Sequence, residues 1–368
     1  MGELDISSVT QRDAEKKTVT VTPSDGPLKP ELRDIISLND FEAVALTSLS
    51  RKSWAFVSSG ANDNLTRNDN VTYLQRVWLR PAIMRNVGTS NTRTNLFGCE
   101  LEIPIYIAPV GAAKAVCEEG ELALAGGAAK SGIIQCIATT SSYPLREILD
   151  TTPTQAFFQL YVNKDREASE RLIRQATLSG KVKAIFVTAD LPVMSKREAD
   201  ERTESTYKNA DMIAINKRNA GTNAKTSGLA KSNSSFIDPT FNWQDLQWLR
   251  HVTSLPILVK GIQRAEDARI AMELGFDGIV IGNHGGRAAD TAPPAIVILL
   301  EVHRNCPEVF QRMKVLVDGG FRRGSDVLKA LCLGASAVGF GRPFMYALSY
   351  GQEGLEHAVN SMCRLPGR

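Results

Sequence analysis

The stretch "GNHGGRAAD", residues 282–290, follows directly on the apolar run "GFDGIVI", residues 275–281. A short apolar run bounded by glycine is typical of a buried strand. The run stops abruptly at Asn283, so we expect His284 at the carboxyl end of the strand, with Arg287 three positions further on. Because the chain has only four histidines, an imidazole at this place is a candidate for chemistry.

Seven further apolar runs of the same kind occur along the chain, and helical patterns lie between them. The eight runs are at residues 103–109, 133–139, 156–162, 183–190, 256–261, 278–284, 314–320 and 337–342. Several of the helical patterns end on glycine, as helix carboxyl termini prefer. Near-continuous apolar strands that alternate with helices indicate a parallel sheet covered on its outer side. Eight such units over roughly 250 residues predict an α/β fold, a closed (β/α)8 TIM barrel; an open, doubly wound sheet is the alternative.

The composition is that of an ordinary globular protein. Of 368 residues, 43% are hydrophobic and 23% are charged, and the formal net charge is +3. This balance gives no reason to expect nucleic acid or a membrane as a partner, and no run of about 18 apolar residues is present. The amino terminus lacks the apolar core of a secretory signal, the carboxyl end lacks a peroxisomal signal, and the six cysteines form no CxxC pair. We therefore expect a cytoplasmic protein with reduced thiols and no bound metal ion.

Two segments depart from the repeating pattern. Residues 1–33 are polar, and we expect a flexible arm there, followed by a single barrel domain at 34–368. That domain opens with an amino-terminal helical extension, predicted as one helix at 37–57, where an asparagine and a glutamate have the spacing of a capping box. A long polar loop follows the fourth strand, between residues 207 and 240. Its length fits either a lid or a solvated insertion without a role.

Polar side chains gather at the carboxyl ends of the predicted strands. They are Gln159, Tyr161, Thr188, Asp190, Lys260, Asn283, His284, Asp318 and Arg342. In a (β/α)8 barrel these ends meet at one face, where active sites form. A lone buried histidine or lysine is usually a satisfied core residue, but a lysine, a histidine, an aspartate and an arginine at one barrel mouth indicate an active site. Because burial of an unpartnered ammonium is very costly, Lys260 needs an anionic neighbour, which a cofactor could supply.

The last two predicted strands also lead into a candidate phosphate site. The segment "DGGFRRGSD", residues 318–326, combines a glycine turn, two arginines and a helix start, and "GFGRP", residues 339–343, adds a further arginine. Backbone N–H groups at the amino end of a helix attract anions, and arginine binds phosphate in a bidentate manner. The loops after strands seven and eight are the usual phosphate position in this fold.

These motifs together resemble those of a known family, the FMN-dependent α-hydroxy acid oxidases and dehydrogenases. That group includes glycolate oxidase, lactate oxidase and the flavin domain of flavocytochrome b2. The resemblance runs from about residue 37 to 360 and includes "SSGANDN", "FFQLYVNKDR", "VTADLPVMSKREAD", "LVKGI", "NHGGRAAD", "DGGFRRGSDVLKALCLGA" and "GRPF". It implies FMN as the cofactor and oxidation of a small 2-hydroxy acid to a 2-oxo acid. It also implies reoxidation by oxygen or another electron acceptor, and a homo-oligomer, a tetramer by analogy.

The resemblance implies catalytic and substrate-binding roles for particular residues. His284 would be the catalytic base, and Asp190 would hold it and stabilise its protonated form. Tyr161 would hydrogen-bond the substrate oxygen. Arg197 and Arg287 would bind the substrate carboxylate, a planar anion that suits guanidinium. For Asp290, which follows them, a loop cap is as good an interpretation as a role in the site.

The same resemblance implies a set of flavin contacts. Lys260 would lie near the N1–O2 edge of the flavin and favour the anionic reduced ring. Gln159 and Thr188 would meet the pyrimidine side. The full set of expected cofactor-binding residues is Pro109, Val110, Gly111, Ala138, Gln159, Thr188, Lys260, Gly282, Asp318, Gly319, Gly320, Phe321, Arg322, Gly341 and Arg342.

The chain also departs from the family pattern near the expected pocket. Phe56 stands where the family usually has a tyrosine that touches the substrate carboxylate. Ala138, Thr139 and Thr140 stand where two serines and a bulky residue are common, and Gly282 replaces a serine. The family's carboxyl-terminal tail is expected to be missing or short. These changes fit either neutral drift or a wider pocket for a different substrate.

The sequence is therefore compatible with three alternative functions. The first is an oxidoreductase for simple 2-hydroxy acids. The second is a flavin-dependent tailoring oxidase for a larger, atypical substrate such as a natural-product intermediate. The third is a flavin-binding protein with little turnover. Retention of the charged residues His284, Asp190, Arg197, Arg287 and Lys260 speaks against the third function.

We predict that Phe56→Tyr tightens the binding of simple 2-hydroxy acids. The added hydroxyl would supply one hydrogen bond to a charged carboxylate, which contributes roughly 1.5–3 kcal/mol, so KM should fall about tenfold or more. Steady-state kinetics with a short 2-hydroxy acid measures this effect. Unchanged KM and kcat/KM in the variant would contradict the expected role of this position.

Overall fold

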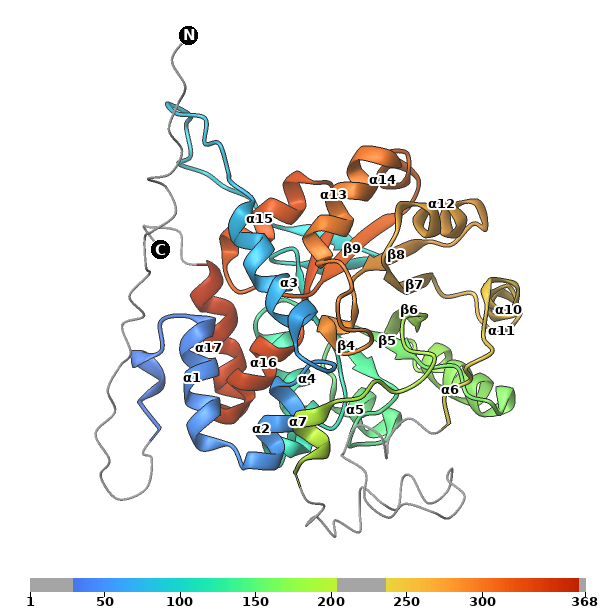
Figure 1. Ribbon diagram of the computed structural model, residues 1–368, viewed down its shortest axis with the longest axis horizontal. Helices are drawn as coiled ribbons and strands as arrows, with labels where there is room; N and C mark the ends of the chain where they lie inside the picture. Colours follow the sequence, from blue (N-terminus) through green and yellow to red (C-terminus); the bar gives the residue numbers. More distant parts are fainter. Residues whose placement is uncertain (1–28, 204–235, 364–368) are drawn as a thin grey trace.

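The computed structural model describes residues 29–203 and 236–363 (Figure 1). Most of the polar arm expected at 1–33 and most of the loop expected at 207–240 lie outside these described residues. Within the part of the chain that is described, no helix is both long enough and apolar enough to cross a bilayer.

Eight parallel strands form a closed barrel, as predicted (Figure 1). The strands are β3 (Ile105–Val110), β4 (Ile134–Ala138), β5 (Ala156–Leu160), β6 (Val182–Thr188), β7 (Ile257–Ile262), β8 (Gly278–Ile281), β9 (Lys314–Asp318) and β10 (Ala337–Phe340). Each strand overlaps one of the eight apolar runs. The sheet closes because β10 pairs with both β9 and β3, which excludes the open, doubly wound alternative.

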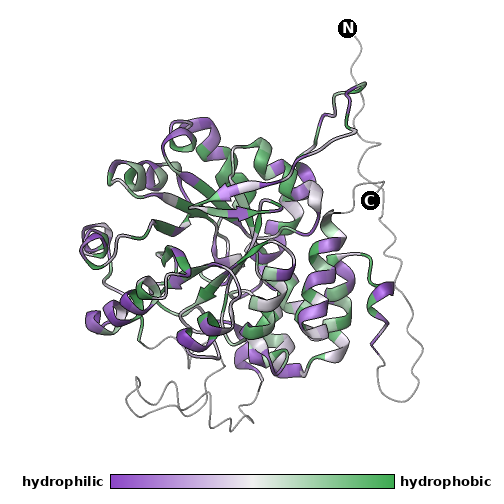
Figure 2. Ribbon diagram, turned by 180° about the vertical axis from the view of Figure 1, so that it is seen from behind, coloured by the Kyte–Doolittle hydropathy of each residue, from purple (hydrophilic) through white to green (hydrophobic). Residues whose placement is uncertain are grey.

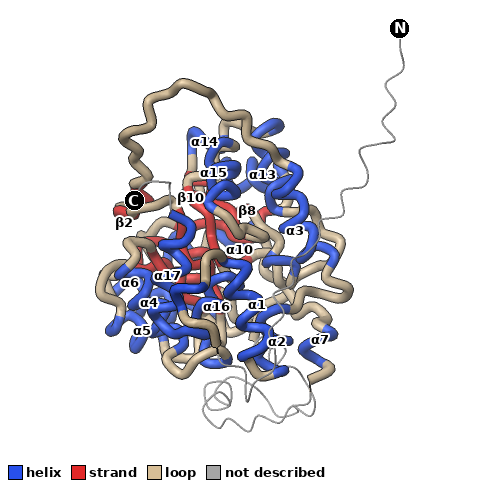
Figure 3. The backbone as a smooth tube through the Cα atoms, turned by 90° about the vertical axis from the view of Figure 1, so that its left-hand side faces the viewer, coloured by secondary structure: helices blue, strands red, loops and turns tan. Residues whose placement is uncertain are grey.

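Helices surround the barrel on its outer side (Figures 1 and 3). They are α4 (Gly120–Lys130), α5 (Leu145–Thr151), α6 (Arg166–Leu178), α7 (Glu198–Glu201), α10 (Trp243–Leu246), α11 (Leu249–Val252), α12 (Ala265–Glu273), α13 (Ala295–Asn305), α14 (Val309–Arg312), α15 (Gly324–Cys332), α16 (Arg342–Ala347) and α17 (Gly351–Cys363). Figure 2 shows hydrophobic residues concentrated on the strands and hydrophilic residues on the outer helices. This distribution is the one expected of strands buried on both faces.

Four helices end at a glycine, as the sequence predicted. Gly132, Gly180, Gly275 and Gly334 follow α4, α6, α12 and α15, with φ values of +64°, +68°, +75° and +97°. Left-handed backbone of this kind terminates a helix and is most easily adopted by glycine.

The register of the strands brings their carboxyl ends to one rim. Ala138 pairs with Gln159 across β4 and β5, and Thr188 pairs with Lys260 across β6 and β7. The polar residues predicted at the strand ends therefore share one end of the barrel.

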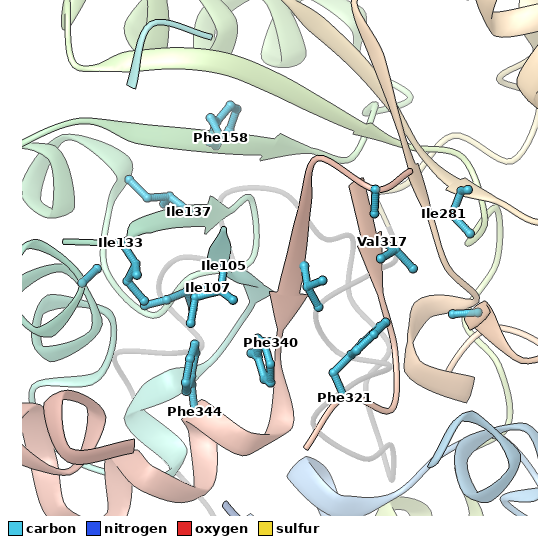
Figure 4. Close-up of a cluster of buried hydrophobic side chains, with 14 of the residues drawn as sticks. Ile105, Ile107, Ile133, Ile137, Phe158, Ile281, Val317, Phe321, Phe340 and Phe344 are labelled. Carbon is cyan, nitrogen blue, oxygen red and sulfur yellow. The ribbon is translucent and has the colours of Figure 1, made fainter. Parts of the chain in front are cut away.

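Two packed layers hold this barrel together. Inside it, the rings of Tyr106, Phe157 and Phe186 are fully buried, and the centroids of Phe157 and Phe186 are 5.1 Å apart. Outside it, apolar side chains fill the space between strands and helices (Figure 4). Phe340 of β10 and Phe344 of α16 stack there with centroids 5.2 Å apart.

The amino-terminal extension forms more elements than the sequence predicted. The single helix expected at 37–57 is two helices, α1 (Leu38–Ser48) and α2 (Arg51–Ser58), because Ser50 caps the second helix by accepting a hydrogen bond from the Ser53 N–H. The expected capping box was also misplaced. Ser37 precedes α1, and its hydroxyl donates to Asp40.

Two further elements of this extension had no sequence prediction. They are helix α3 (Leu65–Arg76) and the hairpin of β1 (Thr94–Leu96) and β2 (Cys99–Leu101). The buried side chains of the hairpin pack with the aromatic rings inside the barrel. The hairpin therefore covers the amino ends of the strands, opposite the rim that carries the polar residues.

We predict that Phe157→Ala lowers the free energy of unfolding by about 3–5 kcal/mol, because the cavity left in the aromatic layer cannot collapse. Leu178→Ala is the matched control, since the Leu178 side chain is 86% exposed and should change stability by no more than about 0.5 kcal/mol. Chemical denaturation of both variants measures the difference. Equal midpoints for the two variants would refute the importance of this layer.

Candidate active site

A cavity of about 650 Å³ opens at the carboxyl ends of the strands. All the site residues predicted from the sequence line it, with two exceptions. Asp190 is fully buried behind His284. Gly282 is also buried, and a Cβ atom there would lie 2.5 Å from Asp318 Oδ1, so a larger residue at this position would require Asp318 to shift.

The turn after β8 holds His284 in an unusual backbone conformation. His284, Gly285 and Gly286 all have positive φ, at +59°, +62° and +72°. A Cβ atom at Gly286 would lie 2.5 Å from the backbone nitrogen of Arg67. Glycine at position 286 is therefore required by the close approach of α3 as well as by the backbone angle.

Two asparagines fix this turn from behind. Asn283 and Asn70 exchange amide hydrogen bonds of 2.9 and 3.0 Å. Asn283 Oδ1 also accepts from the Gly286 N–H at 3.0 Å, and Asn70 Oδ1 accepts from the Ala295 N–H at 2.9 Å. Both amides are buried, so the pair satisfies polar groups that would otherwise be costly.

His284 is hydrogen-bonded at both ring nitrogens. Nδ1 lies 2.8 Å from Asp190 Oδ1, and Nε2 lies 3.1 Å from the Tyr161 hydroxyl. Because an ionised carboxylate can only accept, Nδ1 carries the proton, and the Tyr161 hydroxyl donates to Nε2. The imidazole therefore presents its basic nitrogen to the cavity.

Burial of the His284 ring favours this neutral form. Burial lowers the pKa of His284, Lys260 and Arg197 lower it further, and Asp190 opposes the shift without cancelling it. Burial alone would raise the pKa of Asp190, but His284 and Lys260 outweigh it and lower that pKa below its ordinary value. The arrangement is a neutral base supported by a carboxylate, which is suited to proton abstraction.

The anionic neighbour of Lys260 comes from the protein. Its Nζ lies 3.0 Å from Asp318 Oδ2, and the two side chains are only 4% and 8% exposed. Burial lowers the pKa of Lys260, but Asp318 and Asp190 outweigh burial and raise that pKa above its usual range. The ammonium is therefore charged at the cavity wall, beside Gln159, whose amide donates to Thr188 Oγ1 at 2.9 Å.

Three arginines line the cavity: Arg197 is buried, and Arg287 and Arg342 are half-buried. Burial lowers the pKa of Arg287 to about 9, that of Arg342 to about 9 and that of Arg197 to about 10. Neighbouring arginines add to the effect for each of them. A bound anion would relieve this repulsion. Arg197 Nε is buried and has no hydrogen-bond partner among the described residues.

Backbone carbonyl groups of the amino-terminal extension hold two of these arginines in place. Arg287 Nη1 donates to the carbonyl oxygens of Phe56 and Ser59, both at 2.8 Å. Arg342 donates to Val57 O at 3.1 Å and to Ser59 O at 2.8 Å. The end of α2 thus orients guanidinium groups that belong to the barrel.

The far end of the cavity is cationic. Arg322 pairs with Glu42 of α1 at 3.1 Å, and Arg67 of α3 lies 3.5 Å from the same carboxylate. The glycine turn at 319–320 has positive φ, and a Cβ atom at Gly320 would lie 2.2 Å from Asn70 O. Three arginines, Arg67, Arg322 and Arg342, with the one carboxylate of Glu42 suit an anionic tail. The polar rim at Lys260 suits a ring edge with hydrogen-bond acceptors. The cavity therefore fits a flavin nucleotide.

The model of the FMN-dependent dehydrogenase family matches residues 45–364. The chain belongs to this family. The match confirms the family expected from the sequence motifs, and with it FMN as the cofactor.

Relatives in the FMN-dependent dehydrogenase family match most of the chain. The L-lactate dehydrogenase (cytochrome) of Saccharomyces cerevisiae is 39% identical over 348 residues, which cover 90% of this chain and 57% of that protein. This chain therefore spans little more than half of the yeast relative. Glycolate oxidase 3 of Oryza sativa subsp. indica is 39% identical over 336 residues, with 90% of each protein covered.

Solved structures of the family have the same fold. The recombinant flavin-binding domain of baker's yeast flavocytochrome b2 is 37% identical, with a TM-score of 0.79, and the match covers 90% of this chain and 81% of that one. A mandelate oxidase solved with 3,3-difluoro-2-hydroxy-3-phenylpropionic acid is 35% identical, with a TM-score of 0.76, and covers 89% and 92%.

Several cavity residues were not predicted from the sequence. Glu42, Arg67, Asn70, Leu191, Met194 and Ile237 all line the cavity. The first three come from the amino-terminal extension, whose packing on the barrel has no local sequence signal. Leu191 and Met194 could have been found, because they directly follow Asp190 at a strand end.

Asp290 caps a loop, as one of the two interpretations of its sequence position predicted, rather than taking part in the site. Its carboxylate accepts from the backbone N–H groups of Asp63 at 3.0 Å and Thr66 at 2.9 Å, at the start of α3.

We predict that His284 titrates below its ordinary value of about 6.5, because burial and nearby cations disfavour the imidazolium. In Asp190→Asn the pKa of His284 should fall further, since the variant loses the charge that stabilises the protonated ring. NMR titration of the imidazole signals measures both values, and His284→Gln assigns the signal. A rise of the His284 pKa in Asp190→Asn would contradict this description of the pair.

Proposed function

We propose that this protein is an FMN-dependent oxidoreductase that converts a 2-hydroxy acid to the 2-oxo acid. The single observation that carries the proposal is the convergence of His284, Tyr161, Arg197 and Arg287 on one cavity of the family's fold. A base, a hydrogen-bond donor and two cations for a carboxylate are the groups that this reaction requires.

The chain's own residues would bind and deprotonate the substrate. Arg197 and Arg287 would take the carboxylate, which restores favourable charge around two guanidinium groups that now repel each other. With substrate bound, Tyr161 would donate to the substrate's hydroxyl oxygen in place of His284 Nε2. His284 would then accept the proton of the substrate's hydroxyl group at Nε2 and hold it there, because Asp190 at 2.8 Å from Nδ1 stabilises the imidazolium that forms.

The cofactor would occupy the polar rim and the cationic end. Gln159, Thr188 and Lys260 would meet the ring edge, and Arg322 and Arg342 would meet the phosphate. FMN, when bound, accepts the two electrons and the hydrogen that leave the α-carbon. A charged Lys260 near the ring would favour its anionic reduced form.

The wall beside the base favours a substrate with an apolar side chain of some size. Leu191 and Ile237 pack with Tyr161, and Met194 joins the same cluster. The Phe56 ring lies 5.3 Å from the Arg287 guanidinium carbon and presents no hydroxyl. We therefore infer an (S)-2-hydroxy acid oxidase or dehydrogenase that prefers longer or aromatic side chains over glycolate. A cytoplasmic location and a homo-oligomer stay predictions from the sequence.

We predict that His284→Ala retains FMN but loses reduction of the flavin by substrate by a factor of about 10² to 10⁴, the range typical of a general base. Anaerobic stopped-flow bleaching of the flavin measures this rate, and the flavin absorbance before mixing reports cofactor retention. Reduction at the normal rate in this variant would end the proposed role.

The same assay separates the candidate functions. Purified protein is mixed anaerobically with glycolate, lactate, longer aliphatic 2-hydroxy acids and mandelate. Fast bleaching by the larger acids supports the preference inferred above, and fast bleaching by glycolate supports an ordinary short-chain enzyme. Absence of bleaching by every member of the panel would refute the proposed reaction for these acids and favour a specialised substrate or a flavin-binding role.

A further inference from the structure

A buried carboxylate beneath the cavity wall has no part in the chemistry proposed above. Glu121 lies in the first turn of α4 and is 0% exposed. No arginine, lysine or histidine of the described residues forms an ion pair with it. Burial raises the pKa of Glu121, and hydrogen bonds from backbone N–H groups only partly offset that shift. A carboxylate kept in such a place needs a structural reason.

Glu121 joins two segments that follow neighbouring strands. Its Oε1 accepts from the N–H of Ala113, after β3, and from the N–H of Ser142, after β4, both at 2.9 Å. Two more hydrogen bonds join the same segments. Ala112 N donates to Thr140 O at 3.1 Å, and Lys114 N donates to Ser142 Oγ at 3.1 Å.

These segments carry part of the cavity wall. Val110, Gly111, Ala138 and Thr140 line the cavity immediately before the bonded residues. The two segments are closely packed, because a Cβ atom at Gly111 would lie 2.2 Å from Thr140 Oγ1. A shift of one segment therefore displaces the other.

The sheet itself does not fix this part of the wall. The pairing of β3 with β4 shifts register between Ile107 and Val110 and ends there. Beyond that point, Glu121 Oε1 is the acceptor that the N–H groups of Ala113 and Ser142 share.

We propose that Glu121 is a positioning residue that sets the wall formed by the segments after β3 and β4. The inference rests on the proposed function for the place of FMN against this wall, and its tests by FMN binding and hydrogen exchange need no turnover. The position of Glu121 Oε1, which lets it accept from both N–H groups, determines this role, and the charge of the carboxylate does not. Loss of the shared acceptor would loosen both segments together and misplace the wall relative to His284.

Two matched variants separate reach from charge. Glu121→Asp keeps the charge, but its side chain is one methylene shorter and cannot meet both N–H groups. Glu121→Gln loses the charge and keeps the oxygen in place. We expect the FMN dissociation constant to rise about tenfold in Glu121→Asp, because the two hydrogen bonds from Ala113 N–H and Ser142 N–H cannot both be kept. Glu121→Gln should stay within about threefold of the unaltered protein. Glu118→Asp is the control, because Glu118 is exposed in the same segment.

Hydrogen exchange gives a readout that does not depend on turnover. In the FMN-loaded protein, Glu121→Asp should speed amide exchange in residues 111–116 and 139–144 together, while exchange in β7 and β8 stays unchanged. Unchanged exchange in both segments would overturn the proposal, and so would a Glu121→Gln variant that is as weak in FMN binding as Glu121→Asp. If the unaltered protein oxidises no 2-hydroxy acid, the proposed function fails, yet the exchange and FMN-binding results still decide the role of Glu121.

Discussion

The turn at residues 284–286 is the constraint on which the site depends. Three successive residues with positive φ bring the chain off β8 so sharply that an imidazole faces the cavity while its backbone packs against α3. A non-glycine residue in this conformation is strained, and the asparagine pair behind it holds the strain in place. Asp190 can then meet Nδ1 at 2.8 Å only because Gly261 leaves room, since a Cβ atom there would lie 2.4 Å from Asp190 Cβ.

The cavity is lined by more cationic than anionic side chains. Lys260 has a partner in Asp318, and Arg322 has one in Glu42. Arg197, Arg287 and Arg342 donate to backbone carbonyl oxygens, and burial, together with neighbouring arginines, lowers the pKa of each. Repulsion among these arginines lowers the free energy of unfolding of the ligand-free protein. It also favours the binding of ligands that carry a carboxylate and a phosphate. The distribution of charge thus agrees with the cofactor of the family.

The strands and their polar ends could be predicted because their signals are local. Each apolar run marks one strand, and the parallel order places all the carboxyl ends at one rim. The pairing of Lys260 with Asp318 could not be predicted, because β7 and β9 are separated by β8 and the contact depends on side-chain reach across the rim. The break between α1 and α2 was missed because Ser50 competes as a cap within a continuous helical pattern. Helix α3 and the place of Ile237 in the apolar wall depend on tertiary packing, for which periodicity gives no signal.

The orientation of two arginines of the barrel depends on backbone carbonyl groups at the end of α2, which precedes the barrel in the sequence. Val57 and Ser59 accept from guanidinium groups that belong to the segments after β8 and β10. If a different segment preceded the first barrel strand, the guanidinium groups of Arg287 and Arg342 would lose these hydrogen-bond acceptors. The barrel and the helices before it therefore form one structural unit, and an exchange of segments between relatives should keep the two together.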